Sequence, residues 1–300
     1  MRLRPVTKGP RILAAMTTAP TALRRSKSRV LECPACGSPA PRERCFDDVV
    51  LHRCRRCDHC FTDVDSLEYV GAYDEEWEAL HENWFANPNL SLFSFVAETI
   101  ARYKPDAAVI DIGAGRGELL EYLREHNPRL SLTGIDVSLQ PEIPDVEILQ
   151  GDINSYDFRG RRWDVVVSLA TVEHLADVRS FAALLRSVLV PGGRAVVSTN
   201  NERSIPYDVS HVLKRIGYDV PFKRLYDRHH LNHFNTRSLT ILMERSGLRP
   251  LRLHRHNIPL AAVDMPKESA VLKLGVWASF TLGRLTGRTF FQTLVLENPS

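Results

Sequence analysis

Residues 108–120 read AVIDIGAGRGELL, an apolar run that leads directly into three glycines at alternate positions and then into a helix-forming segment. Glycine permits the backbone angles of a tight strand-to-helix turn, and it lets a ligand approach the main chain without a Cβ in the way. The carboxylate of Asp111, just before the turn, favours a cationic or hydroxylated ligand over a phosphate. A second acidic residue, Asp136, ends the next apolar run, where folds of this kind hold ribose hydroxyls. The stretch therefore predicts a nucleotide-sized site on a strand–turn–helix unit.

Strand and helix patterns alternate along the chain around this stretch. Short apolar runs predict strands at 108–111, 131–135, 146–149, 164–168, 194–199, 251–256 and 290–297. Helical periodicity predicts helices at 75–84, 90–103, 118–125, 180–189 and 236–246. This alternation is typical of βαβ units around a buried parallel sheet, so we expect an α/β fold.

The composition excludes several classes of protein. The chain has 300 residues, of which 44% are hydrophobic and 25% are charged, as expected for a folded globular protein and not for a disordered or collagen-like one. The apolar segment 271–282 contains Lys273 and is too short to cross a bilayer. We expect it to be a core helix. A lid, or a helix in peripheral contact with a membrane that supplies a lipidic acceptor, is the alternative.

The charge is distributed unevenly. Residues 1–60 carry 13 Lys and Arg against 5 Asp and Glu, and no acidic residue precedes Glu32. We interpret residues 1–30 as a flexible basic leader. An organelle transit peptide would have the same composition, and a start at Met16 would remove half of the segment.

Two CxxC pairs separated by 17 residues follow the leader. Four thiolates at this spacing match a structural zinc site, so the predicted Zn²⁺ ligands are Cys33, Cys36, Cys54 and Cys57. Cys45 and Cys60 are left over, which keeps ligand exchange or an iron–sulfur cluster open. Disulfides are disfavoured because no convincing signal peptide points to an oxidising compartment, and a cytoplasmic location is expected.

The ordered motifs between residues 109 and 248 closely resemble class I S-adenosylmethionine-dependent methyltransferases of the small-molecule type. The turn at 189–193 and the segment 230–235 resemble the stretches that precede strands five and six of that family. The resemblance implies S-adenosylmethionine as cofactor, with a glycine loop, a ribose-binding acid at Asp136, an adenine-contacting pair at 152–153 and a residue beneath the methionine moiety. The cofactor residues it implies are Asp111, Gly113, Ala114, Gly115, Gly117, Asp136, Asp152, Ile153 and Ser168.

The resemblance also implies a Rossmann-like, seven-stranded sheet in the order 3-2-1-4-5-7-6 with strand seven antiparallel. The expected organisation is a leader at 1–30, a zinc-ribbon module at 31–66, a helical linker or cap at 67–104 and a methyltransferase domain at 105–300. A zinc ribbon before such a domain resembles two groups: bacterial methyltransferases of sugars and of other natural-product or surface-polysaccharide precursors, and ribosomal RNA guanine methyltransferases with an N-terminal zinc module. The chain looks more like the first group, because a histidine usually takes the place of Cys57 in the second.

The expected activity is transfer of a methyl group to a small-molecule acceptor: a sugar, a lipid-linked compound or a secondary-metabolite precursor. Candidate bases are His174, His230 and His233, although a lone histidine is more often a structural hydrogen-bonding group. The alternatives are an RNA methyltransferase that binds RNA through the leader and ribbon, and a cofactor-binding scaffold without catalysis. RNA is less favoured because the ribbon lacks interleaved aromatic residues that stack on bases.

Overall fold

The computed structural model describes residues 30–47, 49–67, 82–138, 141–263 and 269–300. Its largest unit is a seven-stranded sheet in which β12 runs antiparallel and the other six strands run in one direction. In spatial order the strands are β11 (Arg249–His256), β12 (Phe291–Glu297), β9 (Leu189–Asn200), β8 (Trp163–Leu169), β5 (Ala108–Ile112), β6 (Ser131–Asp136) and β7 (Val146–Gln150). Both the predicted strand order and the antiparallel seventh strand are confirmed.

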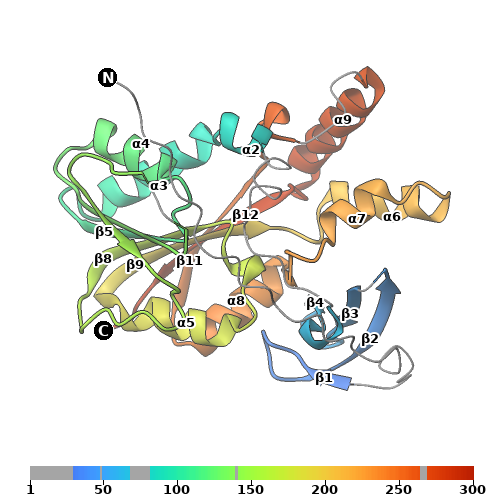
Figure 1. Cartoon of the computed structure of the whole chain (residues 1–300), viewed down its shortest axis with the longest axis horizontal. Coiled ribbons are helices and arrows are strands. Elements are labelled where there is room, and N and C mark those ends of the chain that lie inside the picture. The colour runs from blue at the N-terminus through green and yellow to red at the C-terminus, as the bar shows by residue number, and fades with distance from the viewer. Residues whose placement is uncertain (1–29, 48, 68–81, 139–140, 264–268) are drawn as a thin grey trace, which may run out of the picture.

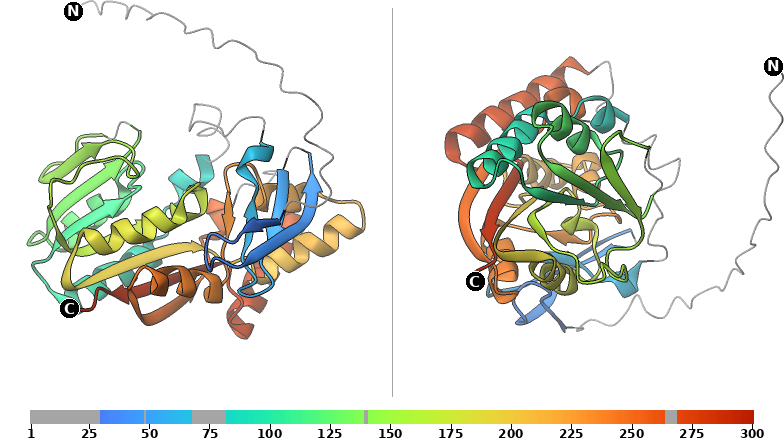
Figure 2. Two further views of the ribbon diagram at one scale, coloured as in Figure 1. Left: turned by 90° about the horizontal axis from the view of Figure 1, so that it is seen from below. Right: turned by 90° about the vertical axis from the view of Figure 1, so that its left-hand side faces the viewer.

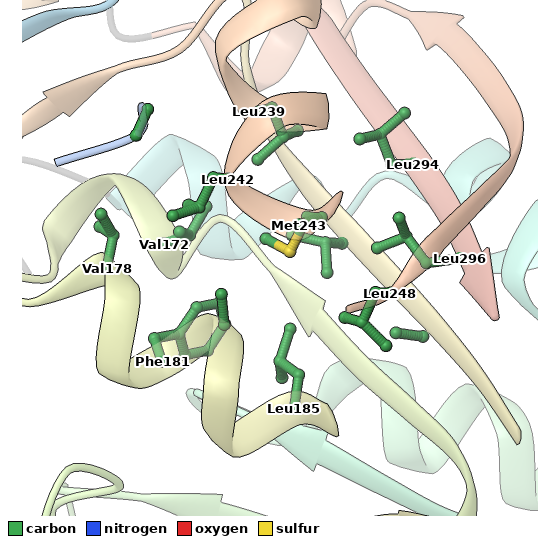
Figure 3. Close-up of a cluster of buried hydrophobic side chains, with 14 of the residues drawn as sticks. Val172, Val178, Phe181, Leu185, Leu239, Leu242, Met243, Leu248, Leu294 and Leu296 are labelled. Atoms are coloured by element: carbon green, nitrogen blue, oxygen red, sulfur yellow. The ribbon is translucent and has the colours of Figure 1, made fainter. Parts of the chain in front are cut away.

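Helices cover both faces of this sheet (Figure 1). Helices α3 (Leu90–Tyr103) and α4 (Glu118–His126) pack on one face, and α5 (Val178–Ser187) and α8 (Thr236–Arg245) pack on the other. Because successive side chains of a strand point to opposite faces, Val109 belongs to the first core and Ile110 to the second. Figure 3 shows the second core, where leucines of α8 and β12 meet Phe181 and Leu185 of α5.

Local signals set the helix boundaries. The side chain of Asn89 caps α3 by accepting from the Leu92 N–H, and Asp177 caps α5 in the same way. The predicted end of α5 is wrong by two residues, because Leu189 already begins β9. Residues 75–81 of the predicted helix at 75–84 lie outside the described residues, and its last three residues belong to α2 (Glu82–Ala86).

The cysteine-containing segment forms a second sheet, which Figure 2 shows beside the end of the large one. Its strands are β1 (Val30–Glu32), β2 (Pro39–Phe46), β3 (Val49–Arg53), β4 (Cys60–Thr62) and β10 (Asn232–His233). A short 3₁₀ turn, η2 (Val64–Ser66), follows β4. Strand β10 comes from the C-terminal half of the chain and pairs antiparallel with β4. The small sheet is therefore completed by the segment that precedes α8.

Three further helices extend from the sheet: α6 (Ile205–Arg215), α7 (Val220–Leu225) and α9 (Ala270–Thr286). They lie on the right in Figure 1, with α9 packed against α6. Two 3₁₀ turns, η3 (Val172–His174) and η4 (Leu260–Ala262), complete the elements. The core-helix interpretation of 271–282 is wrong, because in α9 only Ser279, Phe280 and Gly283 are buried. No helix in the described part of the chain has the length and hydropathy needed to cross a membrane.

Candidate functional site

A cavity of about 340 Å³ opens at the carboxyl ends of β5, β6 and β8. Its size falls within the ~300–1,000 Å³ range of pockets for small ligands and cofactors. It lies at β5, where the chain order of the sheet reverses, which is the usual ligand position in doubly wound α/β folds. Seven of the predicted cofactor residues line it: Asp111, Gly113, Ala114, Gly115, Asp136, Asp152 and Ile153.

The glycine turn after β5 could not be built from larger residues. Gly113 has a φ of +76°, and a Cβ there would lie 2.3 Å from Oγ1 of Thr171. Gly117 has a φ of +84°, and its Cβ would lie 2.4 Å from Cδ1 of Ile143. The left-handed backbone favours glycine at both positions, and at Gly113 the space beside Thr171 is lacking as well. Gly117 is the N-cap of α4 and does not itself line the cavity.

The carboxyl group of Asp111 is buried in the wall of the cavity, with 3% of the residue exposed. Its Oδ1 has no hydrogen-bond partner within the protein. Burial, with help from the nearby carboxylates of Asp136 and Glu118, raises the pKa of Asp111 to about 8. A buried acid without a partner is costly for the fold, whereas a cationic ligand in the cavity would satisfy it.

Asp136 stands at the tip of β6 in a fixed orientation. Its Oδ2 accepts from the N–H of Gly115 at 3.0 Å, and its Oδ1 accepts from the N–H of Ser138 at 2.8 Å. This ties the predicted ribose-binding acid to the glycine turn. Farther along the same wall, Asp152 accepts from the Asn154 N–H at 2.9 Å and lies beside the buried Ile153.

Ser168 lies behind the cavity wall. Its hydroxyl donates to the carbonyl of Ile112 at 2.9 Å and is fully buried. Thr171 also donates to that carbonyl, at 3.3 Å, and Thr171 does line the cavity. In this structure Ser168 supports the end of β5 from behind the cavity wall, and Thr171 lines the cavity in place of Ser168.

Of the three candidate bases, His174 alone borders the cavity. Its Nδ1 donates to the carbonyl of His229 at 2.9 Å, so Nε2 is the acceptor nitrogen of the neutral ring. Burial and the neighbouring His230 lower the pKa of His174 to about 3. The ring is therefore neutral over the physiological pH range and a weaker base than an ordinary histidine.

His230 and His233 lie behind His174. The His230 ring centroid is 4.9 Å from that of His174, and its Nδ1 is 3.9 Å from Oδ2 of Asp227. His233 belongs to β10 and is completely buried beside Tyr226, with burial lowering its pKa well below the usual value. Neither side chain reaches the cavity wall.

Several wall residues carry no recognisable signal in the sequence. Trp84 and Phe85 of α2 close one side, and the guanidinium of Arg116 lies 4.0 Å from the centroid of the Phe85 ring. Ile258 and Phe291, which follow β11 and begin β12, form an apolar end. Ala170 adopts a φ of +54° in the loop after β8; such strain in a non-glycine residue is frequent at functional sites.

The four predicted zinc ligands converge away from this cavity. Their Sγ atoms lie within 4.8 Å of one another, with Cys33–Cys57 at 3.6 Å and Cys36–Cys54 at 3.4 Å. Zn–S bonds of ~2.3 Å in a tetrahedron place sulfur atoms ~3.8 Å apart, so the donor set fits Zn²⁺. None of the four cysteines is in a disulfide.

The two leftover cysteines are not part of the cluster. Cys60 is buried in β4, and Cys45 is exposed on β2. The pKa of the Cys57 thiol is raised by its contact with Cys33 and by burial. The pKa of Cys36 is lowered instead, to about 7, with hydrogen bonds from Ser38 among the causes, so the four thiols do not titrate alike.

Polar contacts join the ribbon to the rest of the chain. The Asn235 side chain donates to the carbonyls of Cys57 and Asp58 at 3.3 and 2.8 Å. His59 bonds Asn232 of β10 at 3.2 Å. The Arg53 guanidinium forms two bonds, of 3.1 and 2.5 Å, to the carboxylate of Glu202, which is buried. The last turn of the ribbon and the segment before α8 therefore form one hydrogen-bonded unit.

Comparison with known proteins places this geometry in a family. A relative described as "Ubiquinone biosynthesis O-methyltransferase, mitochondrial", from Arabidopsis thaliana, is 28% identical over 141 residues, or 40% of this chain and 43% of the relative. A demethylmenaquinone methyltransferase from Thermotoga maritima is 28% identical over 108 residues, or 34% of this chain and 47% of the relative. The chain spans about half the length of the curated relatives it matches.

Among solved structures, phosphoethanolamine N-methyltransferase 2 of Haemonchus contortus, in complex with S-adenosyl-L-methionine, shares the fold with a TM-score of 0.51. It is 14% identical, and the match covers 75% of this chain and 56% of that one. The family model described as a methyltransferase domain matches residues 84–253, more than half of the chain and all of the cavity-bearing strands from β5 to β9. The chain therefore belongs to this methyltransferase-domain family.

Proposed function

We propose that this protein binds S-adenosylmethionine in the cavity after β5 and transfers its methyl group to a small-molecule acceptor. The observation that carries the proposal is the buried carboxyl group of Asp111, whose Oδ1 lacks a partner at the wall of the cavity. S-adenosylmethionine carries an ammonium and a sulfonium group, so a carboxylate in this place would both bind and orient the cofactor.

The other wall residues fit the remaining parts of the cofactor. Asp136 already accepts two backbone hydrogen bonds, and its position at the strand tip suits it to accept further bonds from ribose hydroxyls. Ile153 offers an apolar surface for a flat base, with Asp152 beside it as a hydrogen-bond acceptor. The glycine turn keeps Cβ atoms away from the bound molecule.

The cofactor supplies the reactive methyl group, so the protein's part is alignment of the acceptor with that group. Trp84, Phe85, Ile258 and Phe291 make one end of the cavity apolar, and His174 contributes a neutral imidazole close by. We assign to His174 the role of positioning a polar group of the acceptor through Nε2. The rest of the acceptor would be apolar, to match the apolar end of the cavity. The relatives named for ubiquinone and demethylmenaquinone methylation support a small molecule of this kind.

We further propose that Cys33, Cys36, Cys54 and Cys57 hold a structural Zn²⁺. The fitting sulfur distances and the full burial of the cluster support this role. A closed set of four thiolates leaves no open position on the metal, so the ion would act on the fold and not on the acceptor.

Isothermal titration calorimetry with S-adenosylmethionine and S-adenosylhomocysteine tests cofactor binding. Both ligands should bind the wild type, and Asp136→Ala should weaken both because it removes the acceptor for the ribose and the tie to Gly115. Asp157→Asn, an exposed carboxylate outside the cavity wall, is the matched control. Wild-type affinity in Asp136→Ala would contradict the assigned site, and binding without methyl transfer to any acceptor would favour the scaffold alternative.

A further inference from the structure

Helix α9 presents large apolar side chains to solvent. Val271 is 81% exposed, Leu274 63%, Trp277 55% and Leu285 80%, and Leu282 is exposed as well. Their spacing of three to five residues places them on one side of a helix. We call this set, Val271, Leu274, Trp277, Leu282 and Leu285, the α9 face. Exposed apolar groupings of this extent are uncommon on soluble monomers and mark interaction surfaces.

The opposite side of α9 is packed into the protein. Phe280 is buried and stacks with Phe290 at a centroid distance of 5.9 Å. Ser279 and Gly283 are buried on the same side of the helix. The inner side of α9 therefore makes the core contacts of this helix, and the α9 face is left to solvent.

The charges around the α9 face are positive. Residues 270–286 contain Lys273 and Arg284 but no acidic residue. On a helical projection both basic residues lie at one border of the apolar stripe, next to Trp277. The adjacent α6 adds exposed Val212, and the exposed Ile216 follows it. An apolar face bordered by Lys and Arg is the pattern of helices that lie in the interface of an anionic membrane.

We propose that α9 docks this protein onto an anionic lipid bilayer, with the α9 face in the acyl–headgroup boundary and Lys273 and Arg284 at the lipid phosphates. The charge pattern favours lipid over a second copy of the chain. In a two-fold contact between antiparallel α9 helices, Lys273 of one copy would meet Arg284 of the other, which is unfavourable. Lipid phosphates neutralise both residues instead.

The docked helix would also bring the membrane to the acceptor end of the cavity. Phe280 of α9 packs in one cluster with Ile258, Ala262 and Phe291, all three of which line the cavity, and Trp84 packs against that cluster. The apolar end of the cavity therefore lies next to the buried side of α9. We infer that the acceptor is an amphiphile taken from the bilayer, a step that rests on the proposed function; the docking itself does not.

Vesicle flotation of the full chain, without S-adenosylmethionine, tests docking separately from activity. The wild type should float with phosphatidylcholine vesicles that contain phosphatidylglycerol and should float poorly with phosphatidylcholine alone. Leu274→Glu should lower partitioning at least tenfold, and Lys273→Gln about fivefold. Leu251→Glu is the matched control, because Leu251 is an exposed leucine on the edge strand β11, away from α9.

Equal flotation of wild type and Leu274→Glu would overturn the proposal, as would equal binding to neutral and anionic vesicles. A concentration-dependent dimer in light scattering that Leu274→Glu abolishes would assign the face to a second copy instead. Fluorescence gives an independent readout: anionic vesicles should shift the emission of Trp277 to the blue, and Trp277→Phe should remove that shift. An unaltered Kd for S-adenosylmethionine in Leu274→Glu would show that the variant is folded and that only docking is lost.

Discussion

Replacing Asp111 by Asn isolates the energetic effect of one buried carboxyl group. In the unfolded chain this group titrates near its ordinary pKa of 3.8, whereas in the fold its pKa is about 8. The folded state therefore binds a proton that the unfolded state releases between these two values. The contribution is fully favourable below about pH 4 and is lost as the pH rises toward 8.

The size of the effect follows from the two pKa values. Each pH unit between them lowers the free energy of unfolding by about 1.4 kcal/mol. Across the whole interval the wild type should lose on the order of 5 kcal/mol that Asp111→Asn keeps. The amide has nearly the shape of the protonated acid, so the two proteins should be similarly stable at about pH 4 and differ most at about pH 9.

Urea unfolding of both proteins, without cofactor, at closely spaced pH values measures this difference directly. Other titrating groups are common to the two proteins and cancel in the subtraction. The reasoning is refuted if the difference in unfolding free energy does not change with pH, or if the wild type becomes the more stable one in alkali. Addition of S-adenosylmethionine at about 100 times its Kd should stabilise the wild type by about 2.7 kcal/mol and Asp111→Asn by less, because the carboxylate that balances the cation is gone.

Three further predictions test other parts of the structure. Gly113→Ala should lower the free energy of unfolding by about 2–4 kcal/mol, because it adds a Cβ against Thr171 at a positive φ; urea titration measures this, and Thr171→Ala should recover part of the loss. Arg53→Met should cost about 3 kcal/mol, since it removes the nearest cation from the buried Glu202, which keeps only a hydrogen bond from Tyr226 at 2.7 Å and the more distant Arg203 at 3.9 Å, whereas adding Glu202→Gln should be less harmful than the single change. Elemental analysis of protein purified under reducing conditions should find one zinc ion per chain, and Cys36→Ser should lose it together with thermal stability.

The parts of the fold that are specified locally could be predicted from the sequence. The run 108–120 contains its own strand, turn and helix start, and the structure confirms each of them. The two CxxC pairs likewise determine a cluster of four sulfur atoms. By contrast, β10 has two residues, too few to show any periodicity, and its partner strand lies about 170 residues earlier. The attachment of the ribbon to the segment before α8 was therefore beyond sequence reasoning.

The site follows the same division. The cavity residues contributed by the glycine turn and by the tip of β6 belong to motifs, so their positions were predictable. Thr171, Ile258 and Phe291 reach the cavity only because β8, β11 and β12, which come later in the chain, assemble into the same sheet as β5. Helix α9 was misread for a related reason. An apolar segment shows that a helix has apolar sides, but only the tertiary structure shows which of them is covered.

One connection between the ribbon and the cavity runs through the segment 227–235. Cys57 ends the turn that precedes β4, and β4 pairs with β10, so the cysteine cluster anchors the segment 227–235. Within that segment the carbonyl of His229 accepts from Nδ1 of His174 and thereby fixes the tautomer and orientation of the imidazole at the cavity. The glycine turn follows β5 and Asp136 ends β6, and both strands belong to the seven-stranded sheet and not to the sheet of the ribbon. Loss of the metal should therefore disturb the alignment of the acceptor far more than the affinity for the cofactor. The proposed zinc module would thus act on the acceptor indirectly, because it holds the His229 carbonyl that orients His174.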